Sequence, residues 1–215
     1  MVAAGGMAFA GYDFYQQGWP VDGFGPNIPA EDSALDEYIF DRLIDSLHLN
    51  VRTFLEWIMI LHVMPKVDEI ATAALLAAAG NLAFPLGPAI GAFIGSKADI
   101  FDLGGPGPLL NKTKDEWQTI KAKLDEQAAW PIGLIFGNET SPFEQHQVLA
   151  IGYEDTGLGT ATLKIWDNRD GNSPRDMVLD FRGDELVETG VKGVVKGIFH
   201  EEYTLQKPPQ SLNPS

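Results

Sequence analysis

The sequence predicts an α+β protein in which helices come first and a mainly antiparallel sheet follows. Two observations support this fold class. Up to Leu124, apolar residues recur at the three- and four-residue spacing of helices. From Pro131 to Phe199, the apolar residues fall instead in short runs separated by turn-forming residues, as in extended strands. Strands that follow one another through short turns pair antiparallel, so we expect a hairpin-connected sheet.

Composition limits the function classes open to the chain. Its 215 residues, 45% hydrophobic and 21% charged, predict one globular domain over 1–215, with a helical part (1–110), a helix and sheet (111–206) and a tail (207–215). The formal net charge of −15 argues against binding of nucleic acid or anionic lipid. The absence of cysteine excludes disulfides, thiolate metal sites and thiol nucleophiles. No secretory signal is visible after Met1, and the compartment stays open.

The first two helices are marked by their ends. Residues 7–17 have helical apolar spacing, and Gly18 with Pro20 predicts the helix end. Residues 18–32 are rich in glycine and proline, which predicts a loop. Ser33 is a candidate N-cap of a second helix, whose apolar stripe consists of Leu35, Tyr38, Ile39, Leu43 and Leu47.

Two further helices are predicted over 51–64 and 68–79, the latter very rich in alanine. Residues 70–96 carry no charge, a length that raises the question of a membrane span. Glycines and prolines interrupt this stretch and would leave backbone groups unpaired in lipid. We therefore prefer a buried helix followed by a loop, with membrane contact as the alternative.

After a glycine- and proline-rich loop at 104–108, Thr113 and Glu116 form a capping-box pattern. Trp117, Ile120 and Leu124 then fall on one helical face. Five extended runs follow, at 131–136, 147–153, 160–166, 177–181 and 191–199, with hairpin turns predicted at 157–159 and 170–173. The tail, with three prolines, is expected to be extended on the surface.

A histidine and an aspartate occupy corresponding positions in two of these strands. His146 lies where one strand begins, and Asp167 lies where the next strand ends. If the two strands pair as a hairpin, both side chains come to the same end of the sheet. An aspartate there could orient the ring of a general base. The alternatives are a structural histidine and an aspartate that forms part of a turn.

No other motif predicts a cofactor or a metal. The polar residues 168–172 resemble a calcium loop only in part, because the glycine and glutamate that such a loop requires are missing. A phosphate-binding glycine loop, an HExxH motif and a CxxC motif are all absent from the sequence.

Several segments, in order, resemble a group of uncharacterised bacterial and fungal proteins with a papain-like, C39-like cysteine peptidase fold. The segments are GGMAFAGYDFYQQG, EYIFDRLIDSL, DEWQTIKAKLDEQAAWPIGLIFG, EQHQVLAIGYEDTG, LKIWDNRDG and GIFHEEYTLQKPP. The resemblance covers nearly the whole chain except 70–96, and it implies a papain-like α+β fold and hydrolase activity on peptide or protein substrates.

The resemblance also implies residue roles. The family's first helix begins Cys-Gly-Gly-Met, so the nucleophile position falls on Ala4, the base on His146 and the orienting residue on Asp167. A helix N-terminus suits a thiolate because its positive dipole end lowers the thiol pKa. Alanine cannot form an acyl-enzyme. In such enzymes the residue that donates a hydrogen bond to the oxyanion lies several residues upstream of the nucleophile. In this sequence that region is missing, or Gln145 or Gln147 serves as the donor instead.

Three readings of function follow. The first is a cysteine peptidase or acyltransferase domain whose nucleophile has been changed to alanine. The second is a natural pseudoenzyme that binds a peptide or protein in the retained cleft. The third, compatible with the first, is a toxin-type effector that meets a membrane through 70–96. None of these readings fixes the oligomeric state or the substrate.

Overall fold

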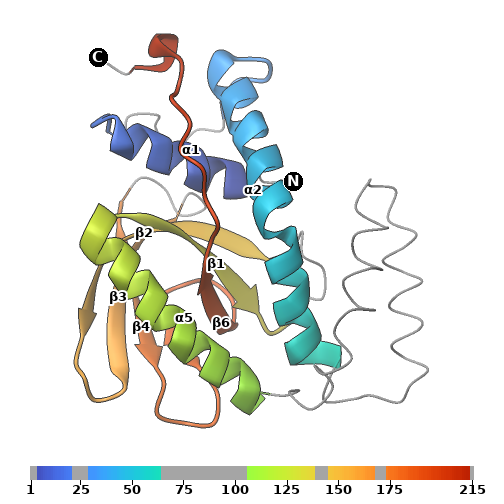
Figure 1. Ribbon diagram of the computed structural model, residues 1–215, viewed down its shortest axis with the longest axis vertical. Coiled ribbons are helices and arrows are strands. Elements are labelled where there is room, and N and C mark those ends of the chain that lie inside the picture. The colour runs from blue at the N-terminus through green and yellow to red at the C-terminus, as the bar shows by residue number, and fades with distance from the viewer. Residues whose placement is uncertain (1–3, 21–28, 64–105, 139–144, 168–172, 214–215) are drawn as a thin grey trace.

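The structure is a computed structural model that describes residues 4–20, 29–63, 106–138, 145–167 and 173–213. It is an α+β fold in which N-terminal helices precede a curled, six-stranded antiparallel sheet (Figure 1). The helix predicted at 68–79 and the apolar stretch 70–96 lie outside the described residues. Within the described parts of the chain, no helix combines the length and the apolar character that crossing a bilayer needs.

Helices α1 (Ala4–Gln16) and α2 (Ala34–Ile58) pack against each other near the N-terminus. As predicted, α1 ends before Gly18, which has a φ of +69°, and Ser33 caps α2 by accepting a 3.2 Å hydrogen bond from the Asp36 amide. The prediction of separate helices through residue 47 and from residue 51 was wrong. Residues 47–51 contain no glycine or proline, so α2 continues unbroken to Ile58 and into the π-helical turn η2 (Met59–Val63).

Helix α5 (Pro106–Gln127) begins seven residues before the predicted capping box. Pro106 and Pro108 are tolerated because the first amides of a helix have no intrahelical acceptor to lose. Thr113 is therefore a buried residue inside the helix, and Glu116 accepts from the His200 amide at 3.1 Å instead of closing a cap. Trp117, Ile120 and Leu124 are buried on one face, as their spacing predicted.

The sheet has the strand order β5-β4-β3-β2-β1-β6, and every neighbouring pair is antiparallel. The prediction of one strand over 191–199 was wrong, because 191–194 form a turn around Gly193, where φ is +126°. A short edge strand, β5, was not predicted. The strands are β1 (Trp130–Phe136), β2 (His146–Asp155), β3 (Thr160–Trp166), β4 (Arg175–Asp180), β5 (Val187–Thr189) and β6 (Val195–His200).

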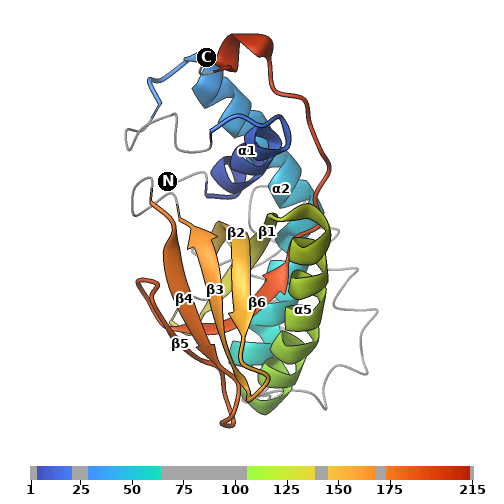
Figure 2. The same cartoon turned by 90° about the vertical axis from the view of Figure 1, so that its left-hand side faces the viewer.

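Figure 2 shows α5 alongside the sheet and α1 above the ends of the strands. The two faces of the sheet pack against different helices. One face and α5 enclose the main core, in which Ile120 of α5 meets Val148 of β2 and Leu163 of β3. The other face packs on α1 and α2, where Tyr12 contacts Leu149. Residues of β2 thus alternate between the two cores, as the two-residue period of a strand requires.

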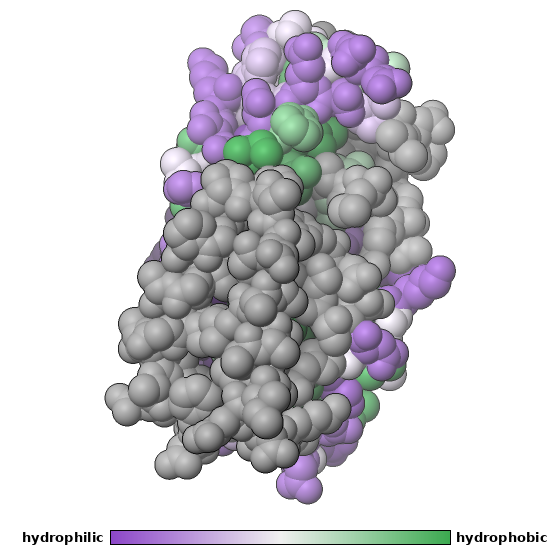
Figure 3. Space-filling model, turned by 90° about the vertical axis from the view of Figure 1, so that its right-hand side faces the viewer, coloured by the Kyte–Doolittle hydropathy of each residue, from purple (hydrophilic) through white to green (hydrophobic). Residues whose placement is uncertain are grey.

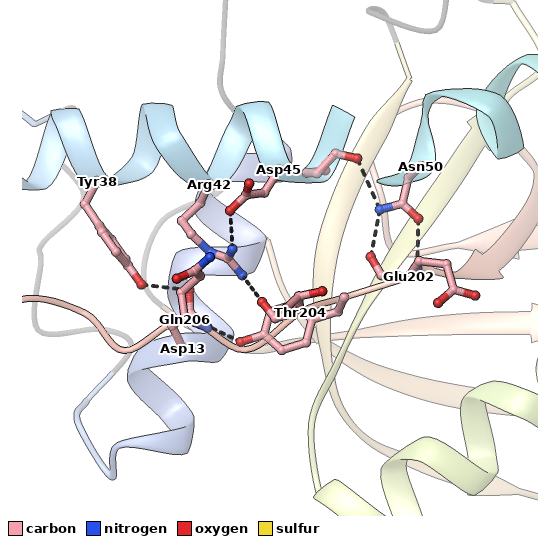
Figure 4. Close-up of polar contacts among 10 residues, drawn as sticks. Asp13, Tyr38, Arg42, Asp45, Asn50, Glu202, Thr204 and Gln206 are labelled. Carbon is pink, nitrogen blue, oxygen red and sulfur yellow. Dashed lines mark hydrogen bonds and ion pairs between the residues drawn. The ribbon is translucent and has the colours of Figure 1, made fainter. Parts of the chain in front are cut away.

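After β6 the chain runs back across α1 and α2, and polar contacts hold it there (Figures 1 and 4). The buried Arg42 binds Asp13 at 2.6 Å and donates to the Thr204 carbonyl at 2.8 Å. Asn50 pairs with the backbone of Glu202 through both its amide nitrogen, at 2.9 Å, and its oxygen, at 2.8 Å. The tail is only partly extended, because a 3-10 turn, η5 (Gln210–Leu212), buries Leu212 against the helices.

Hydrophilic side chains gather at the end of the molecule where α2 begins (Figure 3). The exposed acidic residues of this region are Glu31, Asp32, Glu37 and Asp41. Their charge agrees with the excess of acidic residues in the whole sequence.

Candidate functional site

The structure brings His146 and Asp167 together. His146 is the first residue of β2, Asp167 directly follows β3, and their Nε2 and Oδ1 atoms are 2.8 Å apart. Only 2% of His146 and 1% of Asp167 is exposed. The geometric expectation is confirmed: the two strands pair, and their side chains form a buried imidazole–carboxylate contact.

Strand register explains this contact. Leu149 of β2 lies opposite Trp166 of β3, and the antiparallel direction carries the beginning of β2 toward the end of β3. The His146 ring also stacks on Phe136 of β1, with ring centroids 6.5 Å apart and planes 18° apart. An aromatic ring on one side and a carboxylate at one nitrogen fix the plane of the imidazole.

The hydrogen-bond pattern assigns the ring nitrogens. A carboxylate accepts only, so the neutral ring carries its proton on Nε2 and donates it to Asp167. Nδ1 is then the basic nitrogen of His146. The Asp167 carboxylate would also stabilise the imidazolium that forms when Nδ1 takes a proton.

Ala4 begins α1 and is 9% exposed. Its helix is packed against both α2 and β2. A Cβ atom on Gly5 would collide with Gln147 Oε1, and one on Gly6 would collide with the Ile39 carbonyl oxygen. The two glycines are therefore required for close packing, and they set the first turn of α1 against the neighbour of His146 in β2.

Gln147 and His146 point to opposite faces of β2, since successive strand residues alternate. Gln147 faces α1 and α2, and its Nε2 donates to Ser46 Oγ at 2.6 Å and to Glu201 Oε1 at 2.5 Å. Both amide hydrogens of Gln147 serve this buried network. The Gln145 Oε1 atom accepts from the Phe136 amide at 2.7 Å, so both candidate oxyanion donors bind the protein framework.

Sequence reasoning missed Glu201, which is fully buried and whose pKa burial raises to about 8, while the Gln147 hydrogen bond opposes the shift. The run HEEY looks like an ordinary solvated stretch, and nothing in its spacing marks one glutamate as buried. Only the return of the chain from β6 to the helices places Glu201 inside.

A second histidine–carboxylate pair joins α5 to β6. His200 Nδ1 lies 2.6 Å from Glu116 Oε2, and about a quarter of the His200 side chain is exposed. Because the same carboxylate oxygen also accepts the His200 amide, the pair holds the strand to the helix. Among the described residues, no group of three or more His, Cys, Asp or Glu side chains could hold a metal ion.

Comparisons with known proteins add no relative to this picture. The chain matches no family model, and comparisons with curated proteins and with solved structures found no match.

Proposed function

We propose that this chain has the scaffold of a papain-like cysteine hydrolase acting on peptide or protein substrates, with alanine at the nucleophile position. The buried 2.8 Å contact between His146 Nε2 and Asp167 Oδ1 carries the proposal. In this proposal Nδ1 acts as the base, at the end of the sheet beside which α1 begins. The first turn of α1 packs on Gln147, the residue that follows His146 in β2.

In this proposal each group has a distinct role. A thiol at position 4 would be ionised by His146 and stabilised by the α1 dipole, whose first turn carries no acidic residue. Asp167 would hold the ring and stabilise the imidazolium. With a methyl group at position 4, no thioester forms, and the chain as written has no peptidase turnover by this route.

The second candidate is a pseudoenzyme that uses the retained site to bind a peptide or protein. Ala4 itself favours this reading, since the base and its carboxylate partner are present and the nucleophile alone is lacking. An effector that contacts membranes through 70–96 remains a proposal from sequence alone, because that stretch lies outside the described residues.

Installing a thiol tests the hydrolase proposal. The chain has no cysteine, so Ala4→Cys creates its sole thiol. We expect iodoacetamide to label this thiol near neutral pH about tenfold faster than a free thiol, and His146→Ala to remove the acceleration. Asp167→Asn should slow labelling by a smaller factor, because the ring keeps a hydrogen-bond partner.

Ala34→Cys provides a control at a second helix N-terminus, although Ala34 is exposed and Asp36 and Glu37 lie in the first turn of its helix. Ala34 is the first residue of α2, as Ala4 is of α1, so both thiols experience a helix N-terminus. Only the thiol at position 4 has a histidine proposed beside it. Equal labelling rates at the two positions, unaffected by His146→Ala, would refute the hydrolase scaffold and leave the binding module as the better proposal.

A further inference from the structure

Glu201 lies directly after β6 with its backbone fixed on both sides. Its amide donates to the Pro131 carbonyl at 3.1 Å, and its own carbonyl accepts from Trp130 Nε1 at 3.0 Å. Its side chain is 0% exposed. The backbone of Glu201 is therefore anchored by two contacts that do not depend on the ionisation of its carboxyl.

The Glu201 carboxyl connects to the first turn of α1 through one side chain. Gln147 donates to it at 2.5 Å, and the Gln147 amide oxygen occupies the space that a Gly5 Cβ would need. Within the described residues, Glu201 Oε2 has no hydrogen-bond partner. The contact series from Glu201 through Gln147 to Gly5 thus joins the end of β6, the beginning of β2 and the beginning of α1.

The surroundings of Glu201 favour its neutral form. Gln147 faces it from β2, and Ser46 of α2 faces Gln147, but in the described parts of the chain no charged side chain pairs with it. Arg42, one turn from Ser46 on α2, is paired with Asp13 and Asp45 instead. Burial raises the pKa of Glu201 to about 8, so the carboxyl is protonated at neutral pH and ionises in mildly alkaline solution.

We propose that Glu201, as a neutral acid, is a positioning residue that holds the first turn of α1 against β2 through Gln147, and that its ionisation releases this turn. A carboxylate served by a single amide in a dry site is strongly disfavoured, so water or a side-chain displacement must compensate it. Gln147 is the side chain that such a displacement moves, and Gly5 loses its packing partner with it.

This proposal deepens the proposed function. It rests on that function only where it assigns chemistry to position 4. If position 4 is the reactive position, then Glu201 makes its alignment with His146 depend on pH. The structural part, release of the α1 first turn, stands without that assignment and has its own measurement.

Hydrogen exchange of the unmodified protein tests the structural part. We compare protection factors, which are corrected for the intrinsic exchange rate, at about pH 7 and about pH 9. Release of the α1 first turn is read on the Ala8 and Phe9 amides, which bond the first-turn carbonyls of Ala4 and Gly5. Their protection should fall about tenfold more than that of β3, because a pH one unit above the pKa favours the ionised form tenfold. Glu201→Gln, neutral and of the same shape, should abolish this pH dependence, whereas Glu201→Ala should remove protection at both pH values.

Glu202→Gln is the matched control, since its side chain is 73% exposed and adjacent in sequence. The Glu202→Gln protein should show the same pH dependence of protection as the parent. If Glu201→Gln keeps the parent's pH dependence, or if protection falls equally throughout the sheet, the positioning role of Glu201 is wrong.

Labelling of the Ala4→Cys protein then tests the link to the proposed site. With Glu201 present, the rate per thiolate should fall at about pH 9, and with Glu201→Gln it should not. A local loss of protection without any change in labelling would support the release of α1 and contradict the assignment of chemistry to position 4. Labelling that falls equally with and without Glu201→Gln would contradict the positioning role itself.

Discussion

At the residue scale, the beginning of α1 is defined by what its glycines exclude. Gly5 and Gly6 leave no room for a methyl group, and the atoms in the way are Gln147 Oε1 and the Ile39 carbonyl oxygen. The Ile39 carbonyl belongs to the backbone of α2 and cannot rotate away. Ala4, one residue earlier, is the first position of the helix at which a side chain fits.

Gly6→Ala should destabilise the protein by about 1–3 kcal/mol, because the added methyl group overpacks the contact between α1 and α2. This loss occurs although alanine is the better helix former by about 1 kcal/mol. Urea denaturation measures the change. Gly107→Ala is the control: Gly107 lies in the first turn of α5 with no atom within 4 Å of its Cβ position, so that substitution should be neutral or stabilising.

Arg42 and Asp13 form the buried ion pair that attaches the C-terminal segment to the helices. Burial raises the pKa of Asp13 even though Tyr203, Arg42, the Gln206 amide and Tyr38 all favour its charged form. The pair therefore stabilises the fold only as long as both partners are present.

Arg42→Met should cost about 3–5 kcal/mol, because it leaves the Asp13 carboxylate buried and unpaired. Arg42→Met combined with Asp13→Asn should cost less than the sum of the single changes. Denaturant unfolding of the parent, the two single variants and the double variant gives the coupling energy between Arg42 and Asp13. The control is Arg182→Met, which breaks an exposed ion pair with Asp180 and should cost at most about 1 kcal/mol. Strict additivity would show that the pair contributes no mutual stabilisation.

At the element scale, the sequence allowed prediction wherever local chemistry decides the structure. The Ser33 cap, the end of α1 before Gly18 and the bounds of β3 follow from local signals. Prediction failed where two local signals competed. A capping box at Thr113 looked like a helix start, but Pro106 already occupies a position at which the missing amide costs nothing.

In the candidate site, too, some residues could be predicted from local signals and others could not. His146 and Asp167 could be paired from strand order alone, because antiparallel neighbours bring a strand beginning to a strand end. Glu201 could not be predicted, since its burial depends on the chain crossing from β6 to the helices after the sheet is complete. The catalytic role of the pair stays a prediction.

At the scale of the whole molecule, charge and burial act together on stability. The chain carries a formal net charge of −15, and Glu201 has a pKa of about 8 in the folded state against an ordinary value of 4.5. A raised folded-state pKa contributes stability that is complete below the unfolded value and is lost as pH rises through the folded value. Self-repulsion of the acidic chain acts in the same direction.

We therefore expect the midpoint of urea unfolding to fall steadily between about pH 5 and about pH 8, with a change in free energy of several kcal/mol. Glu201→Gln should flatten most of this slope, and the exposed Glu202→Gln should not. A midpoint that stays constant or rises with pH over this range would contradict the raised pKa of Glu201, because carboxyls with a lowered pKa, such as Asp180, titrate below this range and give no slope in it.

The most direct test of the central claim, that α1 presents position 4 to the His146–Asp167 pair, is a pH titration of the single thiol in the Ala4→Cys protein. Thiolate absorbance should show a pKa well below the ordinary value of about 8.5, and His146→Ala should return it toward that value. The Ala34→Cys thiol should show a smaller change, because the helix N-terminus lowers its pKa while Asp36 and Glu37 in the same turn oppose the lowering. Equal pKa values for the thiols installed at positions 4 and 34, unchanged by His146→Ala, would contradict the claim.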